Sequence, residues 1–356
     1  IHIWINFIEI IFIKFYISWI KMIKNILITG SEGFIGSHLI EKLVLSKKFN
    51  VKALVLYNFK NDIGWLKNLD KSILDNIEII HGDIRDHDLM LKISKKIDVI
   101  VNLAALIGIP YSYDAPKSYI DTNIIGTQNI LQCALKNNIN RIIQTSTSEV
   151  FGNTKFNQKF TESSYQYAQS PYAASKIASD QMTNAYYSSY NLPATIIRPF
   201  NTYGPRQSER AIIPTVINQI LNKSKKIKLG NLFAYRDLNY VDDTVSAYLE
   251  LINTKKKIEG EIFNVGSGYT ILIKDLVLMI KKIMNSKVDI KYDNQRSRPK
   301  KSEVSSLLCN NKKFSKYFNW KPSFEGRNGL KKGIIKTVDW FENNQNYYLK
   351  TSKFIK

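Results

Sequence analysis

The chain has only two cysteines and four histidines among its 356 residues. Cys133 and Cys309 are far apart and lack the spacing of metal ligands, so we expect two reduced thiols and a cytoplasmic protein. His38, His81 and His87 form no ligand set with one another. The sequence therefore predicts no metal site, and we expect His38 on the surface of a helix.

Acidic residues are also scarce, because 30 Asp and Glu stand against 51 Lys and Arg, which gives a net charge of +21. The basic residues are scattered and are not gathered on one surface with stacking aromatics, so we expect no nucleic-acid partner. Most of the excess is interpreted as lysine that fills solvated positions. Part of it could attract an anionic nucleotide.

An apolar stretch occupies the start of the sequence, in residues 1–20. Its length nearly suits a membrane span, but Glu9 and Lys14 interrupt it, and each charge costs about 2.5–3.5 kcal/mol near a bilayer centre. It lacks the basic start and the small-residue cleavage site of a signal peptide. We expect residues 1–22 to be an extension outside the fold, without a membrane partner; a membrane anchor is the alternative.

Strands and helices alternate up to about residue 200, a pattern typical of a parallel α/β sheet. We expect a Rossmann-type doubly wound parallel sheet with a smaller interleaved α/β substrate-binding domain, and a substrate in the cleft between them. The expected parts are a dinucleotide-binding domain over residues 23–200 and about 237–265, a substrate domain over about 201–236 and 266–345, and a tail over 346–356.

The elements beyond residue 200 are less regular. Helices are expected over residues 212–221, 271–283 and 329–341. Residues 236–243 are expected to return to the main sheet and then to begin another helix, with Asp242 or Asp243 as its N-cap.

A short apolar strand, Ile26–Thr29, runs directly into a glycine-rich turn, and a helical pattern follows through Leu45. The glycines have the G-x-x-G-x-x-G spacing. They permit a tight turn and a close approach of the backbone to a pyrophosphate, while the helix N-terminus attracts the anion. The turn is therefore predicted to bind a dinucleotide through Gly30, Gly33, Phe34, Ile35 and Gly36.

The second strand, residues 51–58, lacks the acid that NAD-specific folds often place at its end. It ends in Tyr57-Asn58, and no Arg stands there for a 2′-phosphate. Asp83, after a third strand, could reach the adenine. We predict NAD as the cofactor and leave NADP open. The further expected cofactor contacts are Ile84, Leu103, Ala104, Ala105, Thr122, Ser146, Tyr172, Lys176 and Pro199.

Tyr172 and Lys176 are four residues apart, which places both side chains on one face of a helix. The lysine charge is expected to lower the tyrosine pKa, so that the phenol serves as a base near neutral pH. Thr147, Ser148 and Glu149 stand upstream at a predicted strand end. A plain dehydrogenase needs the Tyr and the Lys but not the Glu. The pattern therefore predicts oxidation of a carbinol followed by further proton chemistry.

Together these motifs resemble the extended short-chain dehydrogenases/reductases of the nucleotide-sugar epimerase/dehydratase group, over residues 23–345. Residues 104–113 and 204–211 resemble more narrowly the GDP-N-acetylglucosamine 4,6-dehydratases of legionaminic acid biosynthesis. The chain departs from that pattern at residues 232–235 and at Leu238, near the expected nucleotide pocket. The motifs that carry the resemblance are Thr29–Gly36, Gly82–Asp86, Leu103–Ala105, Ser146–Gly152, Tyr172-x-x-x-Lys176, Arg198–Arg206 and Arg298-Pro299.

The resemblance implies a nucleotide-diphosphate sugar as substrate and a homodimer formed by helices around residues 123–136 and 172–190. Tyr172, helped by Lys176, would take the proton of the C4 hydroxyl, and Glu149 the C5 proton, before water leaves from C6. Thr147 would bond the C4 oxygen, and Ser148 stands where related dehydratases carry an Asp. The arginines among the expected substrate contacts would clamp the diphosphate. These contacts are Tyr111, Asn201, Arg206, Arg236 and Arg298.

Three other functions stay open. A UDP-glucuronate decarboxylase has nearly the same Thr-Ser-Glu stretch and needs a cation that holds a C6 carboxylate. A 4-epimerase needs no base at C5 and usually carries a small residue where Glu149 stands. A dinucleotide-binding protein without catalysis would not need Tyr172, Lys176 and Glu149.

Overall fold

The protein is described by a computed structural model that covers residues 24–153 and 158–348. The predicted N-terminal extension and residues 349–356 of the predicted tail lie outside these residues. Within the described ranges, no helix has the length and the apolar character that a membrane crossing requires.

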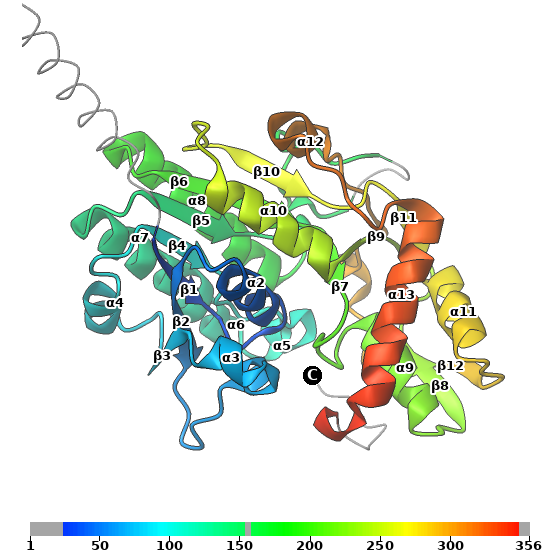
Figure 1. Cartoon of the computed structure of the whole chain (residues 1–356). Coiled ribbons are helices and arrows are strands. Elements are labelled where there is room, and N and C mark those ends of the chain that lie inside the picture. Colours follow the sequence, from blue (N-terminus) through cyan, green and yellow to red (C-terminus); the bar gives the residue numbers. More distant parts are fainter. Residues whose placement is uncertain (1–23, 154–157, 349–356) are drawn as a thin grey trace, which may run out of the picture.

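Seven strands form one parallel sheet in the order β10-β6-β5-β4-β1-β2-β3 (Figure 1). Helices cover both faces of this sheet, so the predicted doubly wound α/β fold is confirmed. The strands are β1 Asn25–Thr29, β2 Asn50–Leu56, β3 Ile77–Gly82, β4 Val99–Asn102, β5 Arg141–Thr145, β6 Ala194–Pro199 and β10 Ile262–Val265.

Successive residues of a strand point to opposite faces, and the packing of β1 follows this rule. Ile26 and Ile28 belong to the hydrophobic cluster beneath α2 (Phe34–Leu45) and α10 (Val241–Asn253). Leu27 belongs to the cluster on the other face. The helices of that other face are α4 His87–Ile93, α7 Gly126–Lys136 and α8 Pro171–Tyr190.

The strand order reverses between β1 and β4, and such a switch point is where open α/β sheets bind ligands. Hydrogen bonds join the two strand ends there. Ala104 N donates to Thr29 Oγ1 at 3.1 Å, and Thr29 Oγ1 donates to Asn102 Oδ1 at 2.6 Å. Asn102 Nδ2 in turn donates to Gln144 Oε1 at 2.8 Å, on β5. The loops that follow β1, β4 and β5 are therefore fixed side by side.

A second, smaller part lies beside the carboxyl edge of the main sheet (Figure 1). In it β9 pairs with β7, β11 and β13, and β8 pairs with β12. Its strands are β7 Asn201–Tyr203, β8 Lys226–Leu229, β9 Tyr235–Tyr240, β11 Thr270–Leu272, β12 Asp289–Tyr292 and β13 Ser306–Leu307. Its helices are α9 Ile212–Leu221, α11 Ile273–Ile283, α12 Lys312–Phe318 and α13 Gly326–Asn343.

The remaining short helical segments lie mostly in the loops of the main sheet. They are η1 Gly64–Asn68, α3 Lys71–Leu74, α5 Ile109–Asp114, α6 Pro116–Tyr119, η2 Ile120–Ile125, η3 Ser148–Phe151, η4 Asn294–Arg296, η5 Lys300–Ser302 and η6 Gln345–Tyr347.

Two predictions for residues 236–243 are wrong. This segment does not return to the main sheet, because β9 pairs with strands of the smaller part. The N-cap of α10 is Tyr240, which makes no side-chain cap. Asp243 lies in the first turn, where its carboxylate accepts the backbone N–H groups of Ser323 and Phe324. It therefore ties α10 to the segment before α13.

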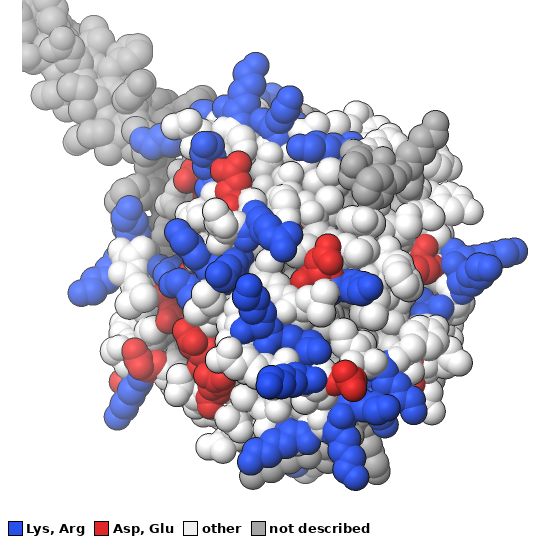
Figure 2. All heavy atoms as spheres, turned by 90° about the vertical axis from the view of Figure 1, so that its right-hand side faces the viewer, with Lys and Arg blue, Asp and Glu red and all other residues white. Residues whose placement is uncertain are grey.

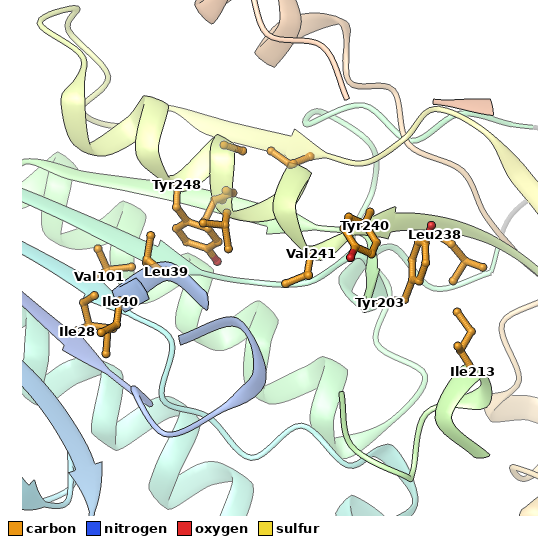
Figure 3. Close-up of a cluster of buried hydrophobic side chains, with 14 of the residues drawn as sticks. Ile28, Leu39, Ile40, Val101, Tyr203, Ile213, Leu238, Tyr240, Val241 and Tyr248 are labelled. Atoms are coloured by element: carbon orange, nitrogen blue, oxygen red, sulfur yellow. The ribbon is translucent and has the colours of Figure 1, made fainter. Parts of the chain in front are cut away.

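One hydrophobic cluster spans both parts of the molecule (Figure 3). It runs from Leu39 on α2 and Tyr248 on α10 to Tyr240 on β9 and Ile213 on α9. The rings of Tyr203 and Tyr240 meet edge to face, with their centroids 5.5 Å apart. Because the two parts share this core, the surface between them is built on fixed elements.

His38 lies inside this junction, and the prediction that it is a helix-surface residue is wrong. Its side chain is 9% exposed, and Nε2 lies 3.1 Å from the carbonyl oxygen of Pro205. Burial lowers the pKa of His38 to about 4, and the nearby charge of Arg206 acts in the same direction. His38 is therefore a neutral contact between α2 and the loop after β7.

Candidate active site

The glycine-rich turn has the shape that a bound pyrophosphate requires. Gly30 has φ +66°, and a Cβ on it would lie 2.8 Å from Ala104 N. A Cβ on Gly36 would overlap the carbonyl of Gly30. Helix α2 begins after Gly33 with no side-chain cap and no acid in its first turn, so its N–H groups are open to an anion. The residues present therefore fit a dinucleotide.

The other predicted cofactor contacts lie on several elements of the main part, and of these Leu103 and Ala104 lie against Gly30 of the turn. Leu103, Ala104 and Ala105 follow β4 and are partly buried. Thr122 lies on η2, a π-helical turn of the kind often found at functional sites. Pro199 ends β6. Ile84 is buried, and a Cβ on Gly126 would collide with it.

Asp83 follows β3 but is already engaged by Arg85. Its Oδ1 accepts the Arg85 backbone N–H at 2.9 Å, and its Oδ2 accepts the guanidinium Nη2 at 2.6 Å. An adenine would therefore compete with an existing ion pair for this carboxylate.

Tyr172 and Lys176 lie on α8 and are 7% and 4% exposed. Lys176 Nζ donates to the carbonyl oxygen of Thr145, at the end of β5, at 2.9 Å. Burial lowers the pKa of Lys176 to about 8. The predicted lowering of the Tyr172 pKa is wrong for the protein without ligand: burial raises it above its ordinary value, and the hydrogen bond with Thr147 only partly opposes this.

Thr147, Ser148 and Glu149 follow β5 directly and are all buried. Thr147 is the N-cap of η3, and its hydroxyl oxygen accepts the backbone N–H of Glu149 at 3.2 Å. Thr147 therefore bonds Tyr172 and Glu149 at once. The charge of Glu149 also acts on Tyr172. The structure thus brings the side chains of Thr147, Glu149 and Tyr172 together at the end of β5.

A buried ion pair lies next to the end of β5, the strand that precedes Thr147. Arg198 Nη2 lies 3.0 Å from Asp180 Oδ2, and both side chains are almost fully buried, at 2% and 0% exposed. Ser146 Oγ, a predicted cofactor contact, donates to the same carboxylate oxygen at 2.9 Å. The charge of Asp180 also raises the pKa of Lys176 against the effect of burial. Asp180 thus connects α8, β6 and the Thr147 loop.

Exchanging Asp180 for Asn is expected to destabilise the fold by about 3–5 kcal/mol, because the substitution leaves the Arg198 guanidinium buried without its counter-ion. Urea unfolding followed by circular dichroism would measure the loss. Asp121→Asn is the matched control, since Asp121 pairs with Lys117 on the surface and is expected to lose no more than about 0.5 kcal/mol. Equal stability of the Asp180 variant and the native protein would contradict this role.

Two of the three predicted arginines reach the same site. Arg298 Nη1 lies 3.4 Å from Glu149 Oε2. Arg236 is 7% exposed, feels the charges of both Glu149 and Arg298, and lies 3.5 Å from Glu303. Two guanidinium groups beside one strand end can hold a diphosphate.

Arg206 does not join these arginines. Its Nη2 lies 2.8 Å from Glu41 Oε2 on α2, so it is held against the dinucleotide-binding part. Asn201 lies on β7, and its Oδ1 is buried without a hydrogen-bond partner among the described residues. An acceptor of this kind is open to a donor on a ligand.

A cavity of about 610 Å³ opens beside Arg298. Tyr111, a predicted substrate contact, is not among its lining residues and is 41% exposed. Tyr113 lines it instead, and its hydroxyl bonds Ser302 Oγ. No motif marked the segment before Arg298, which lies about 150 residues from Glu149 in the sequence. The lining residues are Pro110, Tyr113, Asp114, Gln295, Arg296, Ser297, Arg298 and Pro299.

The charged side chains on one face of the molecule are of both signs (Figure 2). On the face formed by α11, α13 and their neighbours, basic side chains are spread out, with acidic and uncharged residues between them (Figure 2). The overall excess of lysine is therefore not concentrated at one place on this face.

A parallel sheet with a glycine-rich turn at its switch point, beside a buried Tyr-Lys pair, defines a Rossmann-type dinucleotide-binding protein. Comparison with known proteins narrows the class: the family model described as GDP-mannose 4,6 dehydratase matches residues 27–333. The chain belongs to this family of nucleotide-sugar dehydratases and epimerases, within the extended short-chain dehydrogenases/reductases.

Individual relatives carry more than one activity. The chain is 30% identical to a dTDP-D-glucose 4,6-dehydratase of Dictyostelium discoideum, over 92% of this chain and 83% of that one. The dTDP-glucose 4,6-dehydratase DesIV of Streptomyces venezuelae, solved with NAD, is 27% identical with a TM-score of 0.82, and the match covers 91% of this chain and 98% of that one.

A UDP-glucuronic acid 4-epimerase of Bacillus cereus, solved with UDP-glucuronic acid and NAD, is 26% identical with a TM-score of 0.80, and the match covers 90% of this chain and 99% of that one. The relatives thus include both dehydratases and epimerases, so they establish the family without selecting the reaction.

Proposed function

We propose that the protein is an NAD-dependent nucleotide-sugar 4,6-dehydratase of the GDP-N-acetylglucosamine type. The observation that carries this proposal is the buried Glu149 carboxylate beside Tyr172, held 3.4 Å from Arg298. A 4-epimerase has no use for a base at C5, whereas water elimination from C5 and C6 requires one. The dinucleotide-binding turn and the NAD complexes of the structural relatives support NAD as the cofactor.

The proposed cofactor site consists of the glycine-rich turn and the loop after β4. When bound there, NAD+ would supply a reversible hydride acceptor and donor for the oxidation at C4 and the reduction at C6. The chain provides the proton chemistry. Tyr172 takes the proton of the C4 hydroxyl, Thr147 bonds the C4 oxygen, and Lys176 provides positive charge close to the phenol.

The C4 ketone makes the C5 proton acidic, and Glu149 takes it as water leaves from C6. Once a hydride has returned to C6 and a proton from solvent has been added at C5, the product is a 4-keto-6-deoxy sugar, and the proton held by Tyr172 passes to solvent. Arg236 and Arg298 bind the diphosphate, and the cavity beside Arg298 takes part of the nucleotide sugar. Ser148 is a weaker acid than the Asp of related dehydratases, so the departing hydroxyl is protonated by Glu149 itself.

One observation favours a second function, a UDP-glucuronate decarboxylase. Arg298 is a cation that touches Glu149, and a cation near C5 could instead hold a C6 carboxylate. The two reactions share the C4 oxidation and differ in the leaving group, which is water in one and carbon dioxide in the other.

Incubation of the purified chain with NAD+ and a panel of GDP-, UDP- and dTDP-sugars, followed by mass spectrometry, tests the proposal. We expect loss of one water from GDP-N-acetylglucosamine. Loss of carbon dioxide from UDP-glucuronate supports the second function. An isomer of unchanged mass with inverted C4 would contradict both, and binding of NAD+ without turnover of any sugar would point to a non-catalytic protein.

We further propose that the enzyme is a cytoplasmic homodimer that acts in the biosynthesis of a cell-surface sugar of the legionaminic acid type. Exposed apolar residues on the predicted dimer helices support the dimer: Ile125 before α7 is 43% exposed and Tyr190 at the end of α8 is 54% exposed. Sedimentation equilibrium would measure the oligomeric state.

A further inference from the structure

We propose that Glu32 selects the dinucleotide, favouring an adenosine ribose with a free 2′-hydroxyl over one that carries a 2′-phosphate. The inference rests on the proposed dinucleotide site. Folds of this type often bind the ribose with an acid at the end of the second strand. Here β2 is followed by Tyr57-Asn58 without an acid. The carboxylate at this strand end comes from the glycine-rich turn instead.

The structure holds Glu32 from two sides. Leu56, the last residue of β2, donates its backbone N–H to Glu32 Oε1 at 3.0 Å. Trp65 on η1 donates its backbone N–H to the Glu32 carbonyl oxygen at 3.0 Å. Gly64 lets this segment approach, because a Cβ there would lie 2.6 Å from the same carbonyl oxygen. The carboxylate is therefore positioned before any ligand binds.

One carboxylate oxygen of Glu32 can still accept a hydrogen bond. Its Oε2 is buried and has no hydrogen-bond partner within the described part of the chain. On the neighbouring strand β3, whose Gly82 pairs with Leu56, the following residue is Asp83, and both of its oxygens are occupied by Arg85. Glu32 is thus the acid at this edge that can accept from a sugar hydroxyl.

The group at the 2′ position of the adenosine ribose determines whether the dinucleotide can bind beside the Glu32 carboxylate. A 2′-hydroxyl can donate a hydrogen bond to a carboxylate oxygen, whereas a 2′-phosphate has no proton to donate at neutral pH and carries negative charge. Repulsion between two anions close together then disfavours the phosphorylated ribose. A residue of the turn would in this way replace the missing acid of β2.

Glu32→Gln tests the proposal, because Gln keeps an oxygen that accepts from Leu56 N but removes the charge. NAD+ and NADP+ are titrated into the full chain by isothermal calorimetry. The native protein is expected to bind NAD+ at least about tenfold more tightly than NADP+, and the variant to lower this ratio about tenfold, the size of a hydrogen bond to a charged group. Asp62→Asn is the control, since Asp62 lies in the loop between β2 and η1, next to Gly64, and bonds Gly64 N and Lys67.

An unchanged ratio in the Glu32 variant would overturn the assignment, as would a native preference for NADP+ or an equal change in the Asp62 control. With an unchanged ratio or an equal change in the control, the sugar-nucleotide turnover would persist and the proposed function would stand. A native preference for NADP+ would leave the dehydratase reaction standing but would refute its dependence on NAD. Absence of binding of either dinucleotide to the native protein would refute the proposed function, and the assignment of Glu32 would fall with it.

Discussion

Glu149→Gln is expected to lower the rate of water loss by about 10²–10⁴, the usual contribution of a general base. The amide keeps the size of the side chain and an oxygen that can face Arg298, but it cannot take the C5 proton. Binding of NAD+ and of the nucleotide sugar is expected to change little, because neither depends on proton removal. Mass spectrometry of the sugar product measures the rate, and calorimetry measures the binding.

Solvent exchange separates this role from a general disturbance of the site. In heavy water the native enzyme should place deuterium at C5, while the Glu149 variant should not, although it still oxidises C4. Borodeuteride quenching would detect that ketone as deuterium at C4. Glu303→Gln is the matched control, since Glu303 lies beside Arg236, and the variant should change KM more than kcat. Dehydration by the Glu149 variant at the native rate would contradict the assigned role.

The local elements of the dinucleotide-binding part were predictable because each carries its own signal. An apolar run, three glycines and a helical pattern define β1, the turn and α2 without help from the rest of the chain. The pairing of Tyr172 with Lys176 follows from helix geometry in the same way. In all of these cases the residues that interact are close in the sequence.

The errors concern residues whose environment depends on distant segments. His38 has the pattern of a surface position but is covered by the loop that contains Pro205. Residues 236–240 belong to β9, and the pattern of these residues predicts a strand but not its sheet. The partners of β9 are β7, β11 and β13, which no local pattern identifies. The pKa of Tyr172 depends on burial that the spacing of Tyr and Lys does not reveal.

The substrate contacts show the same limit. Arg206 and Arg236 were both predicted to bind the diphosphate, yet Arg206 bonds Glu41 on α2 and Arg236 lies within the influence of the Glu149 charge. The arginine side chain is long and flexible, so the position of an arginine in the sequence gives the approximate place of its guanidinium but not the partner of that group. The sequence identified these arginines as candidates for substrate binding. Only the fold shows that Arg206 bonds a residue of α2, whereas Arg236 and Arg298 lie near Glu149.

Tyr172→Phe is expected to lower kcat by about 10²–10⁴ with little change in the binding of NAD+ or sugar nucleotide. The phenol bonds Thr147 and lies within the influence of the Glu149 charge, and without its hydroxyl the C4 proton has no acceptor. Burial raises the Tyr172 pKa in the protein without ligand, so the phenol stays protonated at neutral pH even with Lys176 on the same helix. The positive nicotinamide ring of NAD+ should lower that pKa, which makes the base available only in the loaded enzyme.

Difference absorbance of tyrosinate between the native protein and the Phe variant would measure this shift. Titration to alkaline pH should show the Tyr172 signal at a lower pH with NAD+ than without it. Tyr119→Phe is the matched control: its ring lies 6.2 Å from that of Tyr172, but its hydroxyl bonds the carbonyl of Gly108. The control should retain most of the turnover. If the Tyr172 variant also retains it, or if NAD+ leaves the titration unchanged, Tyr172 is not the base, and the proton of the C4 hydroxyl must go to another group.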